Sequence, residues 1–330
     1  MKIKSYKKTK LMKKSAVFLA CAIPLGATLP FQVVAQEEQA VENIIVTGTR
    51  MTNRSAADSP VPVDVISGEE FRQNSSADVQ DMLRTAVPSF DINTQPISDA
   101  ATIVRPANLR GLSPDNVLVL VNGKRRHRGS IISFLGGGIS DGAQGVDISA
   151  IPSMALKQVE VLRDGASSQY GSDAIAGVIN FILRDNSEGF EVLARYGSTY
   201  EGDGDNFMVS ANAGFALGDS GFVNVTAEIK EVDGTIRSVV RDDVAFQIAN
   251  GYTAVSDFQL INSYTNEVPQ YWGQPDLEDD IKLFVNSEFE INESAELYLF
   301  GNYGERMVTG GFFYRNVVGG PAGQRGGVYR

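Results

Sequence analysis

Residues 190–232, FEVLARYGSTYEGDGDNFMVSANAGFALGDSGFVNVTAEIKEV, alternate apolar and polar side chains with a period of two. The clearest run, residues 206–217, has apolar side chains at every second position: Phe207, Val209, Ala211, Ala213, Phe215 and Leu217. Because successive side chains of a strand point to opposite faces of its sheet, this pattern predicts strands with one apolar and one polar face. Gly, Asp and Asn lie between the runs, where turns are expected.

Alternation of this kind predicts five strands, over residues 189–198, 206–217, 222–230, 281–291 and 296–306. Each has about the length that a tilted strand needs to cross a bilayer. Aromatic side chains such as Phe190, Phe207 and Phe289 lie near strand ends, as in an interfacial girdle. We therefore expect the apolar faces to contact lipid and the polar faces to point inward. A soluble β-sandwich alternates in the same way and remains the alternative on pattern alone.

The predicted connections favour a membrane barrel over a sandwich. Residues 218–221 and 292–295 are very short connections, 199–205 is of medium length, and 231–280 is long. Outer-membrane barrels have short periplasmic turns and longer extracellular loops in this order. Five strands cannot close a barrel, because an open edge in hydrocarbon leaves backbone groups without partners. We therefore expect residues 189–330 to be the first strands of a truncated, incomplete antiparallel transmembrane β-barrel.

Residues 60–184 predict a separate mixed α/β domain. Capping-box patterns at Ser67/Glu70 and Ser75/Asp78 predict two helix starts. After the second, Val79, Met82, Leu83 and Ala86 share one helical face, and Pro88 is expected to end that helix. Three apolar runs, 117–121, 158–162 and 178–183, predict strands, the first of them closed by the hairpin turn signal Asn122-Gly123. These signals predict a small sheet with helices packed on it.

Residues 1–35 predict a signal peptide. Seven lysines lie within residues 1–14, an apolar run follows to about Phe31, and small side chains at 33–35 precede Gln36. A membrane anchor is the alternative, but Pro24, Gly26 and Pro30 interrupt the run. A lipoprotein signal at Cys21 is disfavoured because only six residues separate that cysteine from Lys14. No later stretch has 18 consecutive apolar residues, so any membrane crossing is expected to use strands.

Composition excludes several function classes. The 330 residues hold 29 Lys and Arg against 40 Asp and Glu, and removing the seven leader lysines leaves 22 basic residues and a net charge of about −18. Phosphate contacts need Lys and Arg, so no nucleic-acid partner is expected. The only Cys is Cys21 and the only His is His127. We expect no cofactor, no Cys- or His-based metal site, no catalytic residue and no enzyme activity.

Three motifs, in order behind the predicted leader, resemble those of the TonB-dependent receptor family. Residues 42–48 (ENIIVTG) resemble a TonB box. Residues 108–112 (NLRGL) with 117–126 (VLVLVNGKRR) resemble the central plug motif, and residues 151–180, which contain VEVLRDG and YGSDAIAGVIN, resemble the plug-closing motif. The resemblance extends from Glu42 to Arg184.

The resemblance implies a plug domain at residues 60–184 lodged in a barrel of about 22 strands, of which residues 189–330 supply about five. It implies a receptor in the outer membrane of a Gram-negative bacterium, surrounded by outer-membrane lipid. Such a receptor binds a small-molecule nutrient and imports it with energy from TonB and the inner-membrane proteins ExbB and ExbD. A ferric siderophore or other iron complex is the expected nutrient, with haem, cobalamin and an oligosaccharide as alternatives. The rival class is a non-transporting surface-binding β-protein.

Residues 36–59 are expected to be a flexible segment that carries the energy-coupling residues Glu42, Asn43, Ile44, Ile45, Val46 and Thr47. β-Branched residues in a flexible segment are suited to adding a strand to a partner's exposed sheet edge. An ordinary linker strand is the alternative.

Ligand contact is expected from two plug loops, residues 92–104 and 124–147. The second contains a basic cluster that suits an anionic ligand: Lys124, Arg125, Arg126, His127 and Arg128. The alternative is that these side chains form salt bridges to acidic side chains of the barrel lumen.

Overall fold

A computed structural model of the chain describes residues 44–45, 54–55, 62–73, 76, 78–92, 101–133, 138–163, 167–235, 237 and 273–310. The predicted signal peptide, residues 1–35, lies outside these ranges, as does most of the predicted flexible segment, residues 36–59. Within the predicted flexible segment, β1 (Ile44–Ile45) pairs antiparallel with β2 (Arg54–Ser55).

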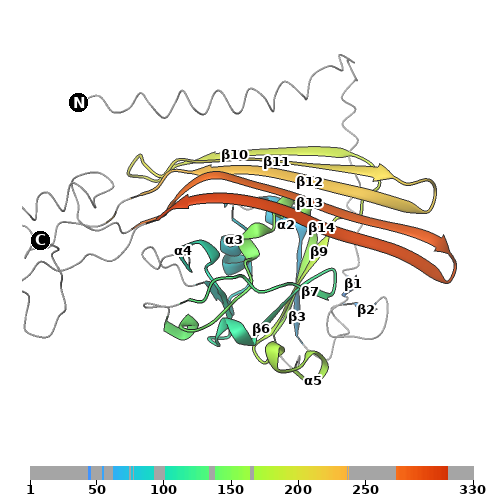
Figure 1. Cartoon of the computed structure of the whole chain (residues 1–330), viewed down its shortest axis with the longest axis horizontal. Coiled ribbons are helices and arrows are strands. Elements are labelled where there is room, and N and C mark those ends of the chain that lie inside the picture. The colour runs from blue at the N-terminus through green and yellow to red at the C-terminus, as the bar shows by residue number, and fades with distance from the viewer. Residues whose placement is uncertain are drawn as a thin grey trace, which may run out of the picture. The chain divides into compact units, whose positions relative to one another are not determined.

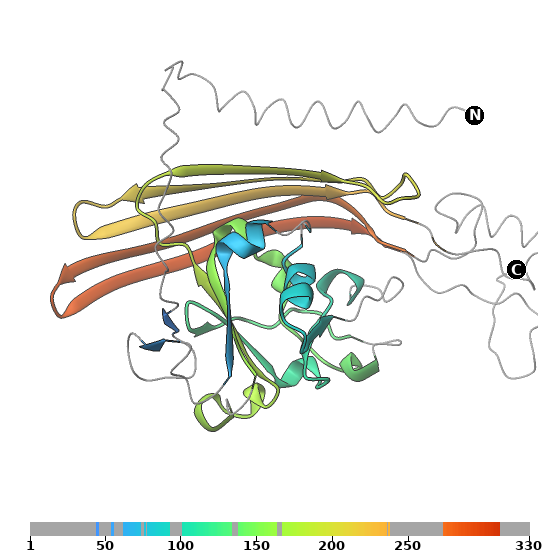
Figure 2. The same cartoon turned by 180° about the vertical axis from the view of Figure 1, so that it is seen from behind.

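Residues 62–184, here called the mixed domain, contain a five-stranded sheet in the order β3-β8-β9-β6-β7. Its strands are β3 (Val63–Ser67), β6 (Val117–Val121), β7 (Lys124–Arg125), β8 (Leu156–Leu162) and β9 (Gly177–Leu183). A small pair, β4 (Phe90–Ile92) and β5 (Ala107–Leu109), lies beside it, with helices α2 (Gly68–Gln73), α3 (Val79–Ala86), α4 (Ala101–Val104) and α5 (Ser167–Tyr170). Short 3-10 turns are η2 (Pro114–Asn116), η3 (Gly138–Ser140), η4 (Ile148–Ala150), η5 (Ser153–Ala155) and η6 (Ser172–Ala174). Figures 1 and 2 show this domain from opposite sides.

The predicted strands of the mixed domain are confirmed. All five residues of β6 are buried, because its two faces are both covered, and it pairs parallel with β9. The turn that follows has positive φ at both central residues, 48° at Asn122 and 73° at Gly123. These are the conformations of a type I′ hairpin, which explains why the Asn-Gly pair marked the end of the strand.

The first predicted helix start is confirmed and the second is corrected. The Ser67 amide donates to Glu70 Oε2 (2.7 Å) and the Glu70 amide donates to Ser67 Oγ (3.2 Å), which is a reciprocal capping box at α2. For α3 the N-cap is Asp78, whose carboxylate accepts from the Gln80 amide (2.9 Å). The box with Ser75 was therefore the wrong start, and Ser75 lies outside the described residues.

The apolar face of α3 also differs at one position. Val79, Met82 and Leu83 are buried, whereas Ala86 is exposed in the last turn and Val87 is buried in its place. The helix ends before Pro88, as predicted, because the chain is already extended at Val87. Packing of this face against the sheet forms one apolar core, whose largest fully buried side chains include Phe71, Met82, Leu109, Ile179 and Phe181.

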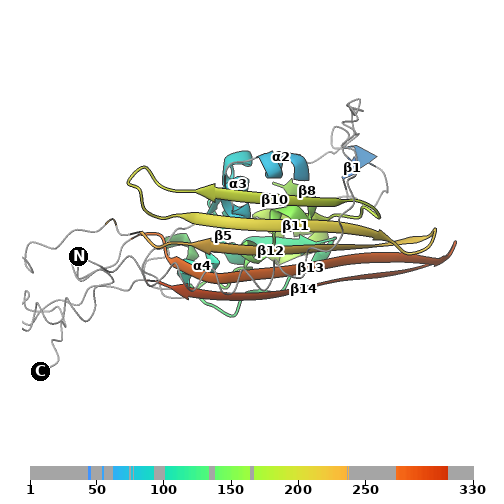
Figure 3. The same cartoon turned by 90° about the horizontal axis from the view of Figure 1, so that it is seen from above.

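The second half of the chain is a five-stranded antiparallel sheet, here called the wall, with strands in sequence order (Figure 3). The strands are β10 (Phe190–Gly197), β11 (Asn206–Ala216), β12 (Gly221–Val232), β13 (Asp276–Asn292) and β14 (Ala295–Thr309). All five predicted strands are present, but β13 begins five residues and β14 ends three residues beyond the predicted limits. The two predicted short turns, after β11 and β13, lie at the same end of the wall (Figure 1).

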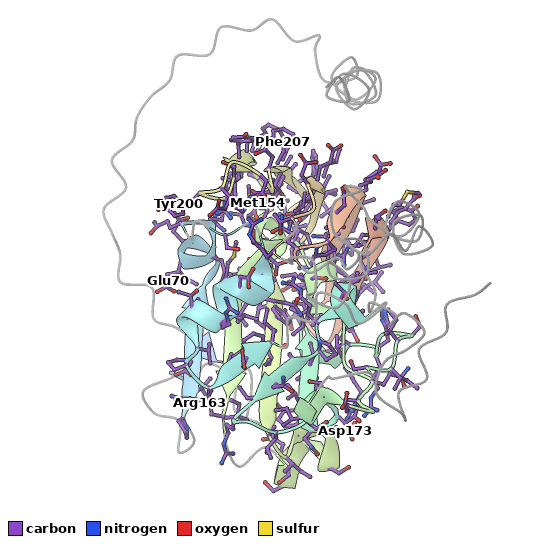
Figure 4. The ribbon with its side chains drawn as sticks, turned by 90° about the vertical axis from the view of Figure 1, so that its left-hand side faces the viewer. Glu70, Met154, Arg163, Asp173, Tyr200 and Phe207 are labelled. Atoms are coloured by element: carbon purple, nitrogen blue, oxygen red, sulfur yellow. The ribbon has the colours of Figure 1, made fainter. Side chains whose placement is uncertain are left out.

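Burial along the wall decides between a membrane barrel and a soluble sandwich. The apolar face is the exposed one, with Phe190 73% and Leu299 61% exposed. The polar face is the buried one, with Ser210 0% and Thr226 1% exposed, because it lies against the mixed domain. Figure 4 shows Phe207 on the outer side of the wall and Met154 on the side of the mixed domain. A soluble sandwich buries its apolar face instead, so the inverted pattern favours a wall surrounded by lipid.

An arginine on the outward face should lower the stability of the protein more in the middle of a strand than near its end. Ala227→Arg, in the middle of β12, is expected to lower the stability of the inserted protein by about 2 to 4 kcal/mol. Val223→Arg, close to the short turn of the same strand, is expected to cost about 0 to 1 kcal/mol because its charge reaches the interface. Urea unfolding in lipid vesicles measures both. Equal losses at the two depths would contradict a lipid-facing wall.

Candidate functional site

The mixed domain and the wall meet through polar side chains. The wall residues that face the domain are almost completely buried: Ser210, Asn212, Asn224, Thr226, Glu228, Lys230, Asp280 and Lys282. A polar group removed from water destabilises the protein unless it is hydrogen-bonded or paired. The partners of these groups therefore specify how the domain docks on the wall. We treat this interface as the candidate functional site.

One group of contacts holds the point where the chain passes from the domain into the wall. Asn122 Nδ2 donates to Asn286 Oδ1 (3.0 Å), and Asn286 Nδ2 donates to the carbonyl oxygen of Arg184 (2.9 Å). The Arg184 guanidinium donates to Asn212 Oδ1 (3.0 Å) and forms an ion pair with Glu191 (2.6 Å). The hairpin turn after β6 is thus tied to β13, and Arg184, which follows β9, is tied to β10, β11 and β13.

A second group centres on the N-cap of α3. Asp78 Oδ2 accepts from Arg105 Nη2 (2.5 Å) and lies 3.6 Å from the Lys230 ammonium on β12. Burial raises the pKa of Asp78, but the charges of Arg105 and Lys230 outweigh it and hold that pKa well below its ordinary value. Burial and the neighbouring Asp78 carboxylate raise the pKa of Asp81. Asp78 is therefore ionised whenever the domain is docked at neutral pH.

A third group lies farther across the wall. Lys282 forms ion pairs with Glu228 (2.8 Å) and Asp280 (3.4 Å), all three on wall strands. Arg306 of β14 pairs with Asp280 (3.1 Å) and reaches Asp147 of the mixed domain (3.7 Å). The two charged groups thus join separate parts of the domain to β12, β13 and β14.

A cavity of about 590 Å³ lies between α3, the residues around α4 and the wall. Its charged and aromatic lining includes Asp78, Asp81, Arg84, Arg105, Arg195, Tyr196, Lys230, Asp280 and Arg306. Most of these side chains belong to the ionic groups just described. The cavity therefore lies at the polar interface between the mixed domain and the wall.

The basic cluster predicted to face a ligand is largely engaged within the protein. Arg125 pairs with Asp173, and Arg128 pairs with Asp115 (3.4 Å), both acids of the mixed domain. Arg126 donates to Asn302 of β14 (2.5 Å).

The remaining two members of the cluster lie beside the wall. The Lys124 ammonium lies 5.1 Å from the ring centre of Tyr298 on β14. His127 is exposed and borders a second cavity beside Arg306. The side chains of the cluster are therefore paired mainly with acids of the mixed domain and with side chains of the wall. Contact between the cluster and a ligand stays a prediction.

The predicted coupling residues are described only in part. Ile44 and Ile45 form β1, opposite Ser55 and Arg54 of β2. The other four, Glu42, Asn43, Val46 and Thr47, lie outside the described residues.

Sequence reasoning missed the ionic groups at the interface. Lys230, Lys282 and Arg306 lie on the polar faces of the predicted strands, but nothing in the pattern pairs them with Asp78 or Asp147. One feature of the sequence could have indicated these ionic groups: charged residues of both signs lie on the inward faces of adjacent predicted strands. Charges on a face that contacts another domain need partners of opposite sign there.

Two features are absent from the part of the chain that the structure describes. None of the helices found there is both long enough and apolar enough to cross a membrane. Within the same residues, no three or more His, Cys, Asp or Glu side chains are grouped so that they could hold a metal ion.

Comparison with known proteins identifies the mixed domain. The family model for the TonB-dependent Receptor Plug Domain matches residues 55–178. The vitamin B12 transporter of Vibrio cholerae serotype O1 is 31% identical over 216 residues, which is 65% of this chain and 31% of that relative. The chain thus spans about 31% of the length of the curated relatives it matches.

Solved structures share the fold. A point mutant of the ferric enterobactin receptor from Pseudomonas aeruginosa, in complex with enterobactin, has a TM-score of 0.54 at 18% identity, covering 76% of this chain and 34% of that one. The siderophore receptor PirA from Acinetobacter baumannii has a TM-score of 0.53 at 19% identity, covering 74% of this chain and 32% of that one. The likeness extends from the mixed domain into the strands of the wall.

Asp78→Asn should separate the contribution of the charge at the interface from the contribution of the helix cap. Asn caps a helix about as well as Asp does, so the substitution keeps the cap and leaves Arg105 and Lys230 buried without their shared anion. We expect stability at pH 7 to fall by about 3 kcal/mol, whereas Arg84→Gln, at a half-exposed ion pair on the same helix, should cost about 0 to 1 kcal/mol.

The same pair of proteins gives a pH prediction. The folded-state pKa of Asp78 is lowered, so its contribution is fully present above the unfolded value of about 4 and is lost as pH falls through the folded pKa. The stability difference between wild type and Asp78→Asn should therefore shrink below about pH 4. Urea unfolding at pH 7 and pH 3 measures it, and a difference that does not change with pH would contradict the ion pair.

Proposed function

Since residues 55–178 are a TonB-dependent receptor plug domain, we propose that the protein is an outer-membrane receptor that actively takes up a scarce nutrient. The observation that carries the proposal is the inverted burial of the wall. Apolar side chains such as Phe190 and Leu299 face outward, and polar side chains such as Thr226 are buried against the plug. That arrangement suits a plugged barrel in lipid and does not suit a soluble or secreted β-protein.

Energy for import must arrive through a protein contact, because an outer membrane has no ATP and maintains no ion gradient of its own. We assign this contact to residues 42–47, where a partner strand can pair with the chain by β-augmentation. The partner is TonB, driven by ExbB and ExbD in the inner membrane. The strand backbone of Ile44 and Ile45 supports the assignment, since it is already extended as a ladder requires.

The nutrient is most simply an iron complex such as a ferric siderophore. Two siderophore receptors share the fold of this chain, and this shared architecture is compatible with an iron complex as the nutrient. Cobalamin is the second candidate, because the curated relative at 31% identity is a vitamin B12 transporter. Haem and an oligosaccharide are further alternatives within the receptor class.

The plug acts as a gate in this proposal and performs no covalent chemistry. The rival class, a surface-binding β-protein without transport, predicts binding that is independent of TonB. The buried charged interface favours the gate, because hydrogen bonds and ion pairs to a plug can be exchanged for water when the plug moves. An adhesion protein has no need of such a replaceable contact.

Ile45→Pro is expected to abolish energised uptake while leaving nutrient binding at the cell surface unchanged. Proline removes a backbone donor and so breaks the ladder that a partner strand would form. Ala40→Pro, in the preceding polar segment, is the matched control and should transport normally. Accumulation of radiolabelled nutrient in cells with and without TonB measures both. Wild-type accumulation by Ile45→Pro would refute the coupling assignment.

Regulation should distinguish the two candidate nutrients. If the cargo is an iron complex, expression should rise severalfold under iron limitation and fall when iron is added. If the cargo is cobalamin, added cyanocobalamin should repress expression and iron should have no effect. Transcript measurement under the two depletions checks this, and repression by neither nutrient would remove both candidates.

A further inference from the structure

The residues that join α2 to α3 are held by the wall. Arg195 of β10 donates to the carbonyl oxygens of Ser76 and Arg72, the latter at 2.5 Å. The Arg72 guanidinium lies 3.3 Å from Glu191, also on β10. Asp78, at the end of the connection, lies 3.6 Å from Lys230 on β12. We call the described residues Arg72, Ser76 and Asp78 the α2–α3 connection.

The same connection is held from the other side by Arg105. Its guanidinium donates to Asp78 (2.5 Å) and lies 4.0 Å from Asp81. Gln80, which is completely buried, donates through Nε2 to the carbonyl oxygens of Val104 (3.3 Å) and Arg105 (2.9 Å). Side chain and backbone at position 105 are therefore both fastened to the first turn of α3.

Arg105 directly follows α4, which is the described end of the plug loop predicted to face the ligand, residues 92–104. Figure 1 places α4 toward the end of the wall where the long connections leave it. The backbone of Arg105 has φ of 44°, a left-handed conformation that a side-chain-bearing residue adopts at a cost of about 1 to 3 kcal/mol. Its partners are Asp78 at the N-cap of α3 and Gln80 and Asp81 in the first turn. These contacts favour this conformation, so their loss would release it.

The α2–α3 connection also leads directly to the coupling end of the plug. Helix α2 follows β3 without an intervening residue, and β3 is an edge strand that pairs only with β8. Residues 42–59, which contain the assigned coupling residues, precede β3. A change at Asp78 can therefore reach the coupling end through one short helix and one edge strand.

We propose that Arg105 is a positioning residue that ties α4 to the α2–α3 connection, and thereby keeps α2, and β3 which directly precedes it, in their docked positions. The proposal rests on the proposed function and deepens it, because it identifies how occupation of the outer side of the plug would loosen the end on which TonB acts. A solute that moves α4 away from α3 would remove the Arg105 guanidinium from Asp78. Lys230 then remains as the only cation within 4 Å of that carboxylate among the described residues.

Amide hydrogen exchange of the intact receptor in detergent tests the proposal without a nutrient or TonB. Arg105→Gln is expected to speed exchange in β3 and α2, residues 63–73, at least tenfold, and to leave the central strands β8 and β9 protected. Arg84→Gln is the matched control, because Arg84 pairs with Asp81 of the same helix (3.8 Å), whereas the ion pairs of Asp78 among the described residues are with Arg105 and Lys230. It should leave exchange in residues 63–73 within twofold of wild type.

A conservative variant separates positioning from simple stability. Arg105→Lys keeps the charge beside Asp78 and should retain most of the protection of β3 and α2. Exchange that is faster only in residues 101–110 of Arg105→Gln would overturn the proposal, because the effect would be local. Loss of protection throughout the plug in both Arg105 variants would also overturn it, since a residue needed only for folding behaves in that way.

A second readout links the residue to coupling. Arg105→Gln receptor should be retained by the immobilised periplasmic domain of TonB at least threefold better than wild type. Unchanged retention, with Ile45→Pro still abolishing uptake, would reject the role of Arg105 and leave the proposed function standing. Normal uptake by Ile45→Pro would instead reject the coupling assignment, and the exchange experiment would still stand on its own.

Discussion

The structure depends on one constraint: a wall whose lipid side is apolar must place its polar side chains inward, and those side chains must find partners there. Glu228, Lys230 and Lys282 are nearly inaccessible to water, so leaving any of them unpaired would cost several kcal/mol. Glu228 and Lys282 pair with each other within the wall. The plug supplies Asp78 to Lys230 and Asp147 to Arg306, and Asn122 and Arg184 add hydrogen bonds to other wall residues. The inward face of the wall and the surface of the plug are in this sense one polar network.

An interface of this kind is both specific and replaceable. Ion pairs and hydrogen bonds fix the orientation of the plug, because each requires a particular donor and acceptor geometry. Water can take over the same groups when the plug moves, which it cannot do for an apolar seal. Apolar contact is limited on the wall side: Phe284 joins the plug core and Phe300 packs against it. The plug can therefore be held firmly at rest and still be moved by a mechanical pull.

The contacts are also unequal along the plug. The region after β9 is covalently continuous with the wall and is reinforced by Arg184. The region before α3 is attached through an edge strand, a six-residue helix and a few charged side chains. In the proposed function, force from the periplasm would enter at this end, so the least reinforced part of the plug would be the part nearest to the assigned coupling residues. The arrangement suits a gate that opens from one side while the remainder stays anchored.

Local patterns in the sequence were sufficient for the wall strands and for β6, β8 and β9 of the plug, but they did not predict β3, β4 or β5. Period-two alternation predicted all five wall strands, Asn122-Gly123 predicted the hairpin, and Ser67 with Glu70 predicted the start of α2, because each of these depends on residues close together in the chain. Such patterns were less reliable where competing caps were available, and at α3 Asp78 capped the helix in place of the predicted box. The pairing of Asp78 with Arg105 and Lys230, and the engagement of the basic cluster by Asp173, Asp115 and Asn302, arose only in the tertiary structure. These partners are separated by many residues in sequence, and periodicity assigns a charge to a face without identifying which distant charge will lie opposite it.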